Sequence, residues 1–268
     1  MNTQRPASNW IRLPRPAPDA QLRLFCFPYA GGSASVYGKW PRIVSPFVEV
    51  CLVEPPGRGD RLREAPLTNM SSLIERLMDA FSTWLDKPFA FFGHSIGGVI
   101  SFELAHALRA EGKPTPMHLF LSACRPPGSN EQQEFRHSLP DSEFIEELRR
   151  LGGTPPEVLE NAELLNLVLP TLRADFELIE KHNSIRADPL ECGITALGGL
   201  DDEEVTPEDL SRWAEATTGA FSVDMYPGDH FFIRNAGAEI MISILLALRA
   251  VCYYQLSQSD NLPARRSA

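Results

Sequence analysis

The sequence predicts an α/β fold: a mostly parallel central sheet flanked by helices, with a helical segment inserted near the middle of the chain. Short apolar runs alternate with amphipathic helical patterns as far as Arg125. One such run, Phe89–Phe92, passes through Gly-His-Ser-Ile-Gly directly into a helical pattern. Strand patterns then stop and resume only at Gly193. Alternating strands and helices indicate a parallel sheet covered on both faces.

The expected strands are short, apolar and bounded by turn-forming residues, which is typical of strands buried on both faces. Asn9–Leu13 is either a mobile end or an edge strand. The six runs that we interpret as strands are Leu22–Phe27, Val48–Val53, Phe89–Phe92, Met117–Ala123, Gly193–Leu197 and Phe221–Tyr226.

Helices are expected where apolar residues recur every three or four positions. The pattern predicts helices over Ser71–Asp86, Val99–Leu108, Pro207–Thr217 and Ala236–Tyr253. Residues 1–250 then form a single domain. The polar residues 255–268 are expected to be a disordered tail.

Residues from about 125 to 189 interrupt the alternation with helical patterns alone. We expect three helices there, over Asp141–Leu151, Glu157–Leu169 and Pro170–His182. The middle segment carries more leucine than a solvated helix needs, so these helices either pack on the core or form a lid over an active site. The lid is favoured because the insertion falls between two sheet strands.

Composition excludes several classes of function. A formal net charge of −10 over 268 residues argues against nonspecific binding of nucleic acid or of anionic membranes. No apolar run has transmembrane length, and the first residues lack the apolar core of a secretion signal, so a cytoplasmic location is expected. The five cysteines are dispersed, without C-x-x-C, and are interpreted as buried thiols. The six histidines form no ligand set; we expect no metal, no cofactor and a monomer.

Residues Gly93 to Gly97 match the pattern G-x-S-x-G. An ordinary Gly/Ser turn would also match, but the strand-like run before it and the helical pattern after it favour a nucleophile elbow. In that arrangement Ser95 sits on a sharp turn above the sheet. The stretch is neither G-x-G-x-x-G nor a phosphate-binding loop with Gly-Lys-Ser/Thr.

A serine hydroxyl needs a base, and the base needs an orienting carboxylate. In enzymes with this elbow, the acid and then the histidine follow the serine along the chain. His230 is the one histidine after a late strand, so it is the predicted base. The acidic turn from Asp201 to Glu204 follows the preceding strand, and a Gly-x-x-Asp turn from Gly199 favours Asp202 over Asp201.

The oxyanion of an acyl-transfer intermediate is expected to bind two backbone amides. One is the amide after the nucleophile, which belongs to Ile96. The other is expected in the Gly-rich stretch after the first long strand, where Ala30 is the candidate; a plain turn is the alternative.

Together these residues resemble the type II thioesterases that act beside nonribosomal peptide synthetases and polyketide synthases. The resemblance runs from about Trp10 to Arg249. It is carried by FPYAGGSASVYGKW, EPPGRGDRLREAP, FFGHSIGG, SACRPPG, the LGGTPPEVLENAELLNLVLPTLRADFELIE block and PGDHFFI.

The resemblance implies an α/β-hydrolase fold with a helical lid. It also implies hydrolysis of acyl groups from the phosphopantetheine arm of acyl- or peptidyl-carrier protein domains. Ser95, His230 and the Asp202 position match the family's triad, and Ala30 and Ile96 match its oxyanion hole. Two departures stand out: the acid turn reads GGLDDEE, which leaves Asp201 and Asp202 open, and Asp229 precedes the histidine where glycine is usual.

The same residues are compatible with other functions. An esterase or acyltransferase would use the same triad, and a non-catalytic partner would only bind carrier proteins. In the loop PGRGDRLRE, Arg58, Arg61 and Arg63 either contact an acidic carrier protein or pair internally with Asp60 and Glu64.

Overall fold

The computed structural model describes residues 9–44, 46–126, 128, 135–182 and 188–259. Seven strands form one sheet in the order β1-β3-β2-β4-β5-β6-β7, and every neighbouring pair is parallel except β1 with β3. The strands are β1 (Ile11–Arg12), β2 (Leu22–Phe27), β3 (Val48–Val53), β4 (Phe89–His94), β5 (His118–Ser122), β6 (Gly193–Gly199) and β7 (Phe221–Tyr226).

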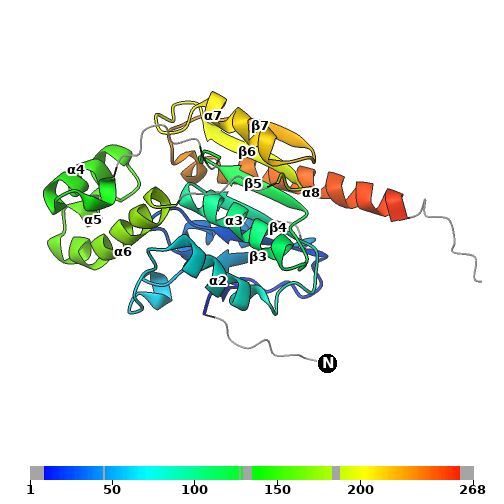
Figure 1. Ribbon diagram of the computed structural model, residues 1–268, viewed down its shortest axis with the longest axis horizontal. Coiled ribbons are helices and arrows are strands. Elements are labelled where there is room, and N and C mark those ends of the chain that lie inside the picture. Colours follow the sequence, from blue (N-terminus) through cyan, green and yellow to red (C-terminus); the bar gives the residue numbers. More distant parts are fainter. Residues whose placement is uncertain (1–8, 45, 127, 129–134, 183–187, 260–268) are drawn as a thin grey trace, which may run out of the picture.

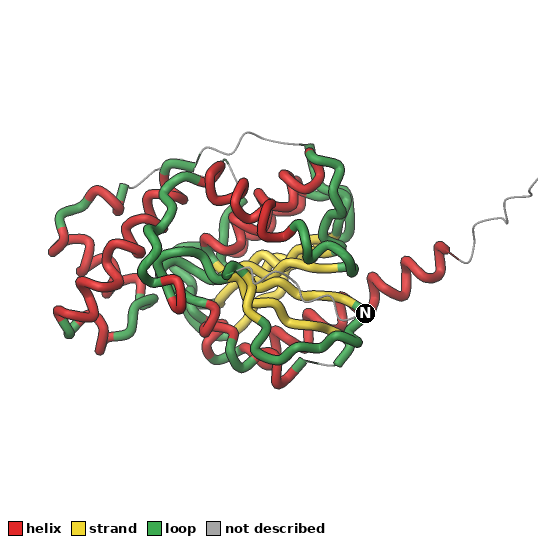
Figure 2. The backbone as a smooth tube through the Cα atoms, turned by 90° about the horizontal axis from the view of Figure 1, so that it is seen from below, coloured by secondary structure: helices red, strands yellow, loops and turns green. Residues whose placement is uncertain are grey.

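Helices cover both faces of the sheet (Figures 1 and 2). On one face, α2 (Met70–Phe81) and α3 (Ile96–Ala110) pack on Phe25, Phe27 and Phe91. On the other face, α1 (Trp40–Ile43) and α8 (Gly237–Ser259) pack on the alternate residues of the same strands, such as Leu24 and Cys26 of β2. Successive residues of a strand point to opposite faces, so near-continuous apolar runs such as LRLFCF fill both cores.

The elements around the sheet differ from expectation mainly at their ends. α2 ends at Phe81 rather than at Asp86, because the Ser82 hydroxyl and amide turn back to the Asp79 carbonyl. The helix expected over Pro207–Thr217 divides into α7 (Pro207–Ser211) and a 3-10 segment, Arg212–Ala216. α1 and the further 3-10 turns Ala34–Tyr37, Gly59–Arg61 and Phe232–Arg234 were not expected.

The closing helix α8 is longer than predicted. It continues to Ser259, so residues 255–259 are helical and not part of a disordered tail. No glycine or proline lies between Tyr253 and Ser259 to end the helix. Residues 260–268 lie outside the described residues. None of the helices in the described ranges is long and apolar enough to cross a membrane.

The insertion between β5 and β6 is helical, as expected, and projects from one end of the domain (Figure 1). It contains the 3-10 turn Arg136–Ser138, α4 (Asp141–Leu151), α5 (Pro156–Leu159) and α6 (Ala162–Glu180). The prediction that Pro170 separates two helices is wrong, since α6 runs through it. Proline removes one amide donor, but Leu169 and Leu172 beside it are buried in a small core with Phe144 and Leu148.

A buried histidine in β5 makes the fold sensitive to acid. His118 is 5% exposed and its Nε2 lies 2.9 Å from the Thr195 hydroxyl. Burial lowers the pKa of His118 from 6.5 to about 4. Between these values the unfolded chain binds a proton that the folded chain does not, so the free energy of unfolding falls as the pH is lowered.

We expect His118 alone to contribute a loss of about 3 kcal/mol between pH 6.5 and pH 4. Urea unfolding at a series of pH values measures this loss. In His118→Gln the slope of unfolding free energy against pH should be shallower over that window. An unchanged slope would contradict the prediction.

Candidate active site

Ser95 occupies a strained turn between β4 and α3. Its φ of +54° is in the left-handed region, which a residue other than glycine rarely adopts. The Ser95 amide donates to the Ser122 carbonyl at 2.7 Å, so the turn is fixed to the end of β5. The side chain is half-buried and borders the main cavity. Sequence and structure therefore agree on a strand–turn–helix with serine at its apex.

Two glycines permit this turn because the backbones approach very closely. A Cβ atom at Gly93 would lie 2.2 Å from the Gly97 carbonyl oxygen. At Gly97 it would lie 2.3 Å from the Phe27 carbonyl oxygen. α3 can therefore start directly against the ends of β4 and β2.

Gly97→Ala should destabilise the domain by about 3 kcal/mol or more, because backbone atoms and not flexible side chains occupy the space. Urea denaturation measures the change. The matched control is Gly112→Ala, where a Cβ meets nothing within 4 Å and only the φ of +62° is unfavourable. We expect that control to cost about 1 kcal/mol. Equal losses in the two variants would contradict the close approach at Gly97.

The structure brings His230 and Asp202 together. The His230 Nδ1 atom lies 2.9 Å from Asp202 Oδ2, and the Asp202 side chain is fully buried. The other carboxylate oxygen accepts hydrogen bonds from the amides of Glu204 at 2.8 Å and Val205 at 3.1 Å. Asp201 is exposed, and among the residues that the structure describes only its amide is engaged, with the Gly228 carbonyl. Asp202, and not Asp201, is therefore the carboxylate that contacts His230.

The turns after β6 and β7, each of which contains a glycine, hold Asp202 and His230 close together. Gly199 ends β6 so close to the histidine loop that a Cβ there would lie 2.4 Å from the Asp229 carbonyl oxygen. The amides of Leu200 and Asp201 donate to Tyr226 and Gly228. The Asp229 carboxylate accepts from the Phe231 amide at 2.8 Å, so this unusual residue stabilises the loop that carries His230.

Ser95 and His230 open onto one cavity of about 780 Å³. Its walls include the apolar side chains of Tyr29, Phe231 and, from α4 and α6, Leu148, Leu172 and Phe176. Charged residues such as Arg136, Glu180 and Glu204 line it as well. A cavity of this size can hold an extended ligand that carries both apolar and polar groups.

The two predicted oxyanion donors also border this cavity. Ile96 is the first residue of α3, and Ala30 lies in a turn closed by a hydrogen bond from Gly32 N to Tyr29 O at 2.9 Å. Within the described part of the chain, neither the Ala30 nor the Ile96 amide donates to a protein acceptor. Both amides are thus available to bind a ligand oxygen.

His94, inside the elbow, supports the histidine loop. Its ring is fully buried, with Nδ1 2.8 Å from the Ser122 hydroxyl, and its centroid lies 5.4 Å from that of His230. Burial, and then the nearby charge of His230, hold the pKa of His94 well below 6.5. His94 therefore stays neutral near pH 7.

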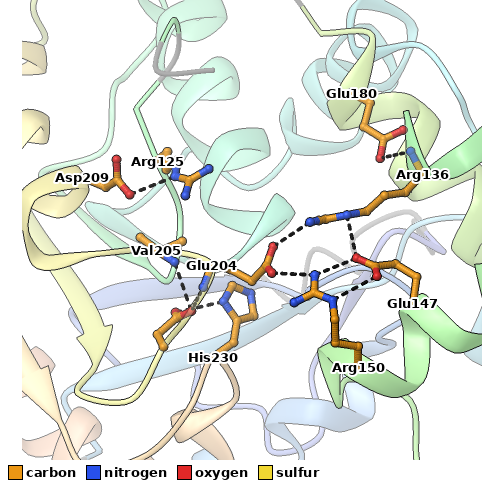
Figure 3. Close-up of polar contacts among 10 residues, drawn as sticks. Arg125, Arg136, Glu147, Arg150, Glu180, Glu204, Val205, Asp209 and His230 are labelled. Atoms are coloured by element: carbon orange, nitrogen blue, oxygen red, sulfur yellow. Dashed lines mark hydrogen bonds and ion pairs between the residues drawn. The ribbon is translucent and has the colours of Figure 1, made fainter. Parts of the chain in front are cut away.

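An ionic network joins α4 to the acid turn (Figure 3). The Glu204 carboxylate contacts Arg136 at 3.1 Å and Arg150 at 2.8 Å, and both guanidiniums also contact Glu147. Burial raises the pKa of Glu204, but the two arginines outweigh burial and lower it. The sequence showed only an acidic turn here, and no local pattern pointed to its partners.

The loop arginines turn out to pair internally at two of three positions. Arg58 is buried against Asp175, and Arg61 contacts Glu64 at 2.5 Å and lies over the Trp10 ring. Asp60 pairs with Arg12 instead of with a loop arginine. For Arg58 and Arg61 the structure therefore favours internal pairing over contact with a carrier protein, because both side chains are buried. Only Arg63 of the three is exposed.

Residues 22–248 match the family model described as thioesterase domain. The chain belongs to the thioesterase domain family. Among its relatives is the "Gramicidin S biosynthesis protein GrsT" of Aneurinibacillus migulanus, 44% identical over 232 residues, with 87% of this chain and 91% of the relative covered.

Solved structures of type II thioesterases are similar to this chain over most of its length. The type II thioesterase BorB from the borrelidin biosynthetic cluster superposes with a TM-score of 0.80 at 34% identity, covering 90% of this chain and 96% of BorB. ClbQ belongs to the colibactin pathway of mixed nonribosomal peptide and polyketide synthesis. It superposes with a TM-score of 0.83 at 33% identity, covering 88% of this chain and 100% of ClbQ. These likenesses confirm the predicted α/β-hydrolase fold and the resemblance to type II thioesterases. This thioesterase is a hydrolase that acts on thioesters.

Proposed function

We propose that this thioesterase removes acyl groups from the phosphopantetheine arm of acyl- or peptidyl-carrier domains, as an editing enzyme beside a nonribosomal peptide or polyketide synthase. The observation that carries the proposal is the buried Asp202–His230 pair, which opens with Ser95 onto a single large cavity. The relatives' names support the choice of pathway.

In the proposed mechanism Ser95 Oγ attacks the thioester carbonyl carbon, and its proton passes to His230 Nε2. That nitrogen is available because Nδ1 faces Asp202. The Ala30 and Ile96 amides hold the oxyanion. As the intermediate collapses, the C–S bond breaks and the pantetheine sulfur leaves. A thiol, with a pKa near 8.5, needs less protonation to depart than an amine.

The second half-reaction releases the acyl group. Water gives a proton to His230 and attacks the acyl-Ser95 ester at the same oxyanion site. Collapse of this intermediate returns the proton to Ser95 Oγ and frees the carboxylic acid. The helices α4 and α6, which wall the cavity, act as the lid that admits the pantetheine arm.

A cytoplasmic location and a single domain spanning residues 1–250 complete the proposal. All five cysteines are free thiols, which suits a reducing compartment.

The test compares three substrates that carry the same acyl group: the acyl-carrier protein, its N-acetylcysteamine thioester and an oxoester. We expect kcat/KM for the carrier thioester to exceed that for the oxoester by about 100-fold, since binding energy from the arm and carrier lowers the barrier. Faster oxoester hydrolysis would indicate an esterase. Transfer to an added alcohol or amine in place of water would indicate an acyltransferase.

A further inference from the structure

A buried carboxylate on α6 contacts the turn that carries Ala30. Asp175 Oδ2 accepts a hydrogen bond from the Gly31 amide at 2.7 Å. The same oxygen accepts from Arg58 Nη1 at 2.7 Å, and Oδ1 accepts from Arg58 Nη2 at 2.8 Å. Both side chains of this bidentate pair are 7% exposed. Two parallel hydrogen bonds between a guanidinium and a carboxylate fix the orientation of both side chains as well as neutralising their charges.

The turn depends on the peptide that Asp175 holds. Gly32 N donates to Tyr29 O, Gly31 has a φ of +72°, and Ala30 is outside the left-handed region, which is the pattern of a type II turn. The middle peptide of such a turn, between Ala30 and Gly31, points opposite to its direction in a type I turn. Reversing it would break the bond to Asp175 and change the ψ of Ala30.

Neighbouring contacts hold α6 against the same region. Leu172 packs so closely on Gly31 that a Cβ there would lie 2.5 Å from its Cδ2 atom. One turn before Asp175, the Thr171 hydroxyl donates to the Gly57 carbonyl at 2.6 Å. The contacts between α4 and the acid turn are, by contrast, partly exposed, with Arg150 at 47%. Of the two helices that wall the cavity, α6 is thus the more firmly held.

We propose that Asp175, paired with Arg58, is a positioning residue for acyl transfer: by holding the Gly31 amide it fixes the conformation and position of the turn that presents the Ala30 amide to the oxyanion. α6 is then part of the catalytic apparatus as well as of the lid. The inference rests on the proposed function, because it takes Ala30 as an oxyanion donor.

The chain provides a closely matched control. Glu49 and Arg23 form a second buried ion pair, with side chains 4% and 1% exposed and Nε–Oε2 at 3.0 Å. Glu49 also accepts from a loop amide, that of Ala17, at 3.0 Å. This pair lies at the second residues of β2 and β3, whereas Ala30 lies three residues beyond Phe27, at the other end of β2.

The experiment replaces each pair by apolar residues, Arg58→Met with Asp175→Leu and Arg23→Met with Glu49→Leu, so that no buried charge is left alone. On an N-acetylcysteamine thioester we expect the 58/175 variant to lose about 10- to 100-fold in kcat, with KM changed less than about threefold. Its affinity for an acyl trifluoromethyl ketone, which forms an oxyanion adduct with serine, should fall in parallel. The 23/49 variant should keep kcat within about twofold of wild type.

Equal kcat in the two double variants, at a temperature where circular dichroism shows both folded, would overturn the inference. If the 58/175 variant does not fold, Asp175→Asn against Glu49→Gln makes the same comparison, with the same outcome required. The proposed function is tested separately: if Ser95→Ala is inactive while the 58/175 variant is not impaired, only the role of Asp175 fails.

Discussion

Ser95→Ala should lower kcat for thioester hydrolysis by about 10⁴-fold or more, because the proposed covalent pathway has no other nucleophile. The fold should survive, since the Ser95 side chain is half-buried and caps no backbone amide of α3. Steady-state kinetics and a thermal melt measure the two effects.

Ser101→Ala is the matched control for this variant. Ser101 lies on the same helix and its hydroxyl donates to the Gly98 carbonyl, a local bond that contributes little to stability. We expect nearly wild-type turnover from it. A fluorophosphonate should label wild type and Ser101→Ala but not Ser95→Ala. Undiminished hydrolysis by Ser95→Ala would remove the elbow from the mechanism.

Asp202→Asn should slow turnover by about 10³- to 10⁴-fold, because an amide cannot hold His230 in the tautomer that accepts the serine proton. Asp201→Asn changes the neighbouring, exposed carboxylate and should have little effect. Both changes remove one negative charge from the same turn. A difference in kcat between the two variants therefore reports the contact of Asp202 with His230 and not the loss of charge. kcat on a carrier-bound thioester is the measurement. A costly Asp201→Asn with an active Asp202→Asn would reverse the assignment of the acid.

The sequence was sufficient for several strands and for the nucleophile elbow, where the signal is local. β2, β3 and β7 have the predicted bounds, because apolar runs bounded by turn residues depend only on neighbours in the chain. The same holds for the elbow, where glycine spacing and the switch from strand to helix placed Ser95. Asp202 could be favoured over Asp201 from Gly199, but only the fold shows which carboxylate reaches His230.

Two of the features that sequence analysis missed depend on burial or on contacts between distant segments. Asp175 and Arg58 are 117 positions apart, and nothing near either residue indicates that they pair. The helix through Pro170 is another case, because burial of the leucines around it outweighs the local tendency of proline to break a helix.

In the proposed reaction Ser95 takes the acyl group from a carrier's pantetheine arm and gives it to water. Rapid-quench intact-mass spectrometry of enzyme mixed with acyl-carrier protein tests this directly. The carrier should lose the mass of the acyl group while the enzyme briefly gains it on the peptide that contains Ser95, and the free acid should appear last. Deacylation of the carrier by Ser95→Ala at the wild-type rate, with no acyl group found on the wild-type enzyme, would contradict it.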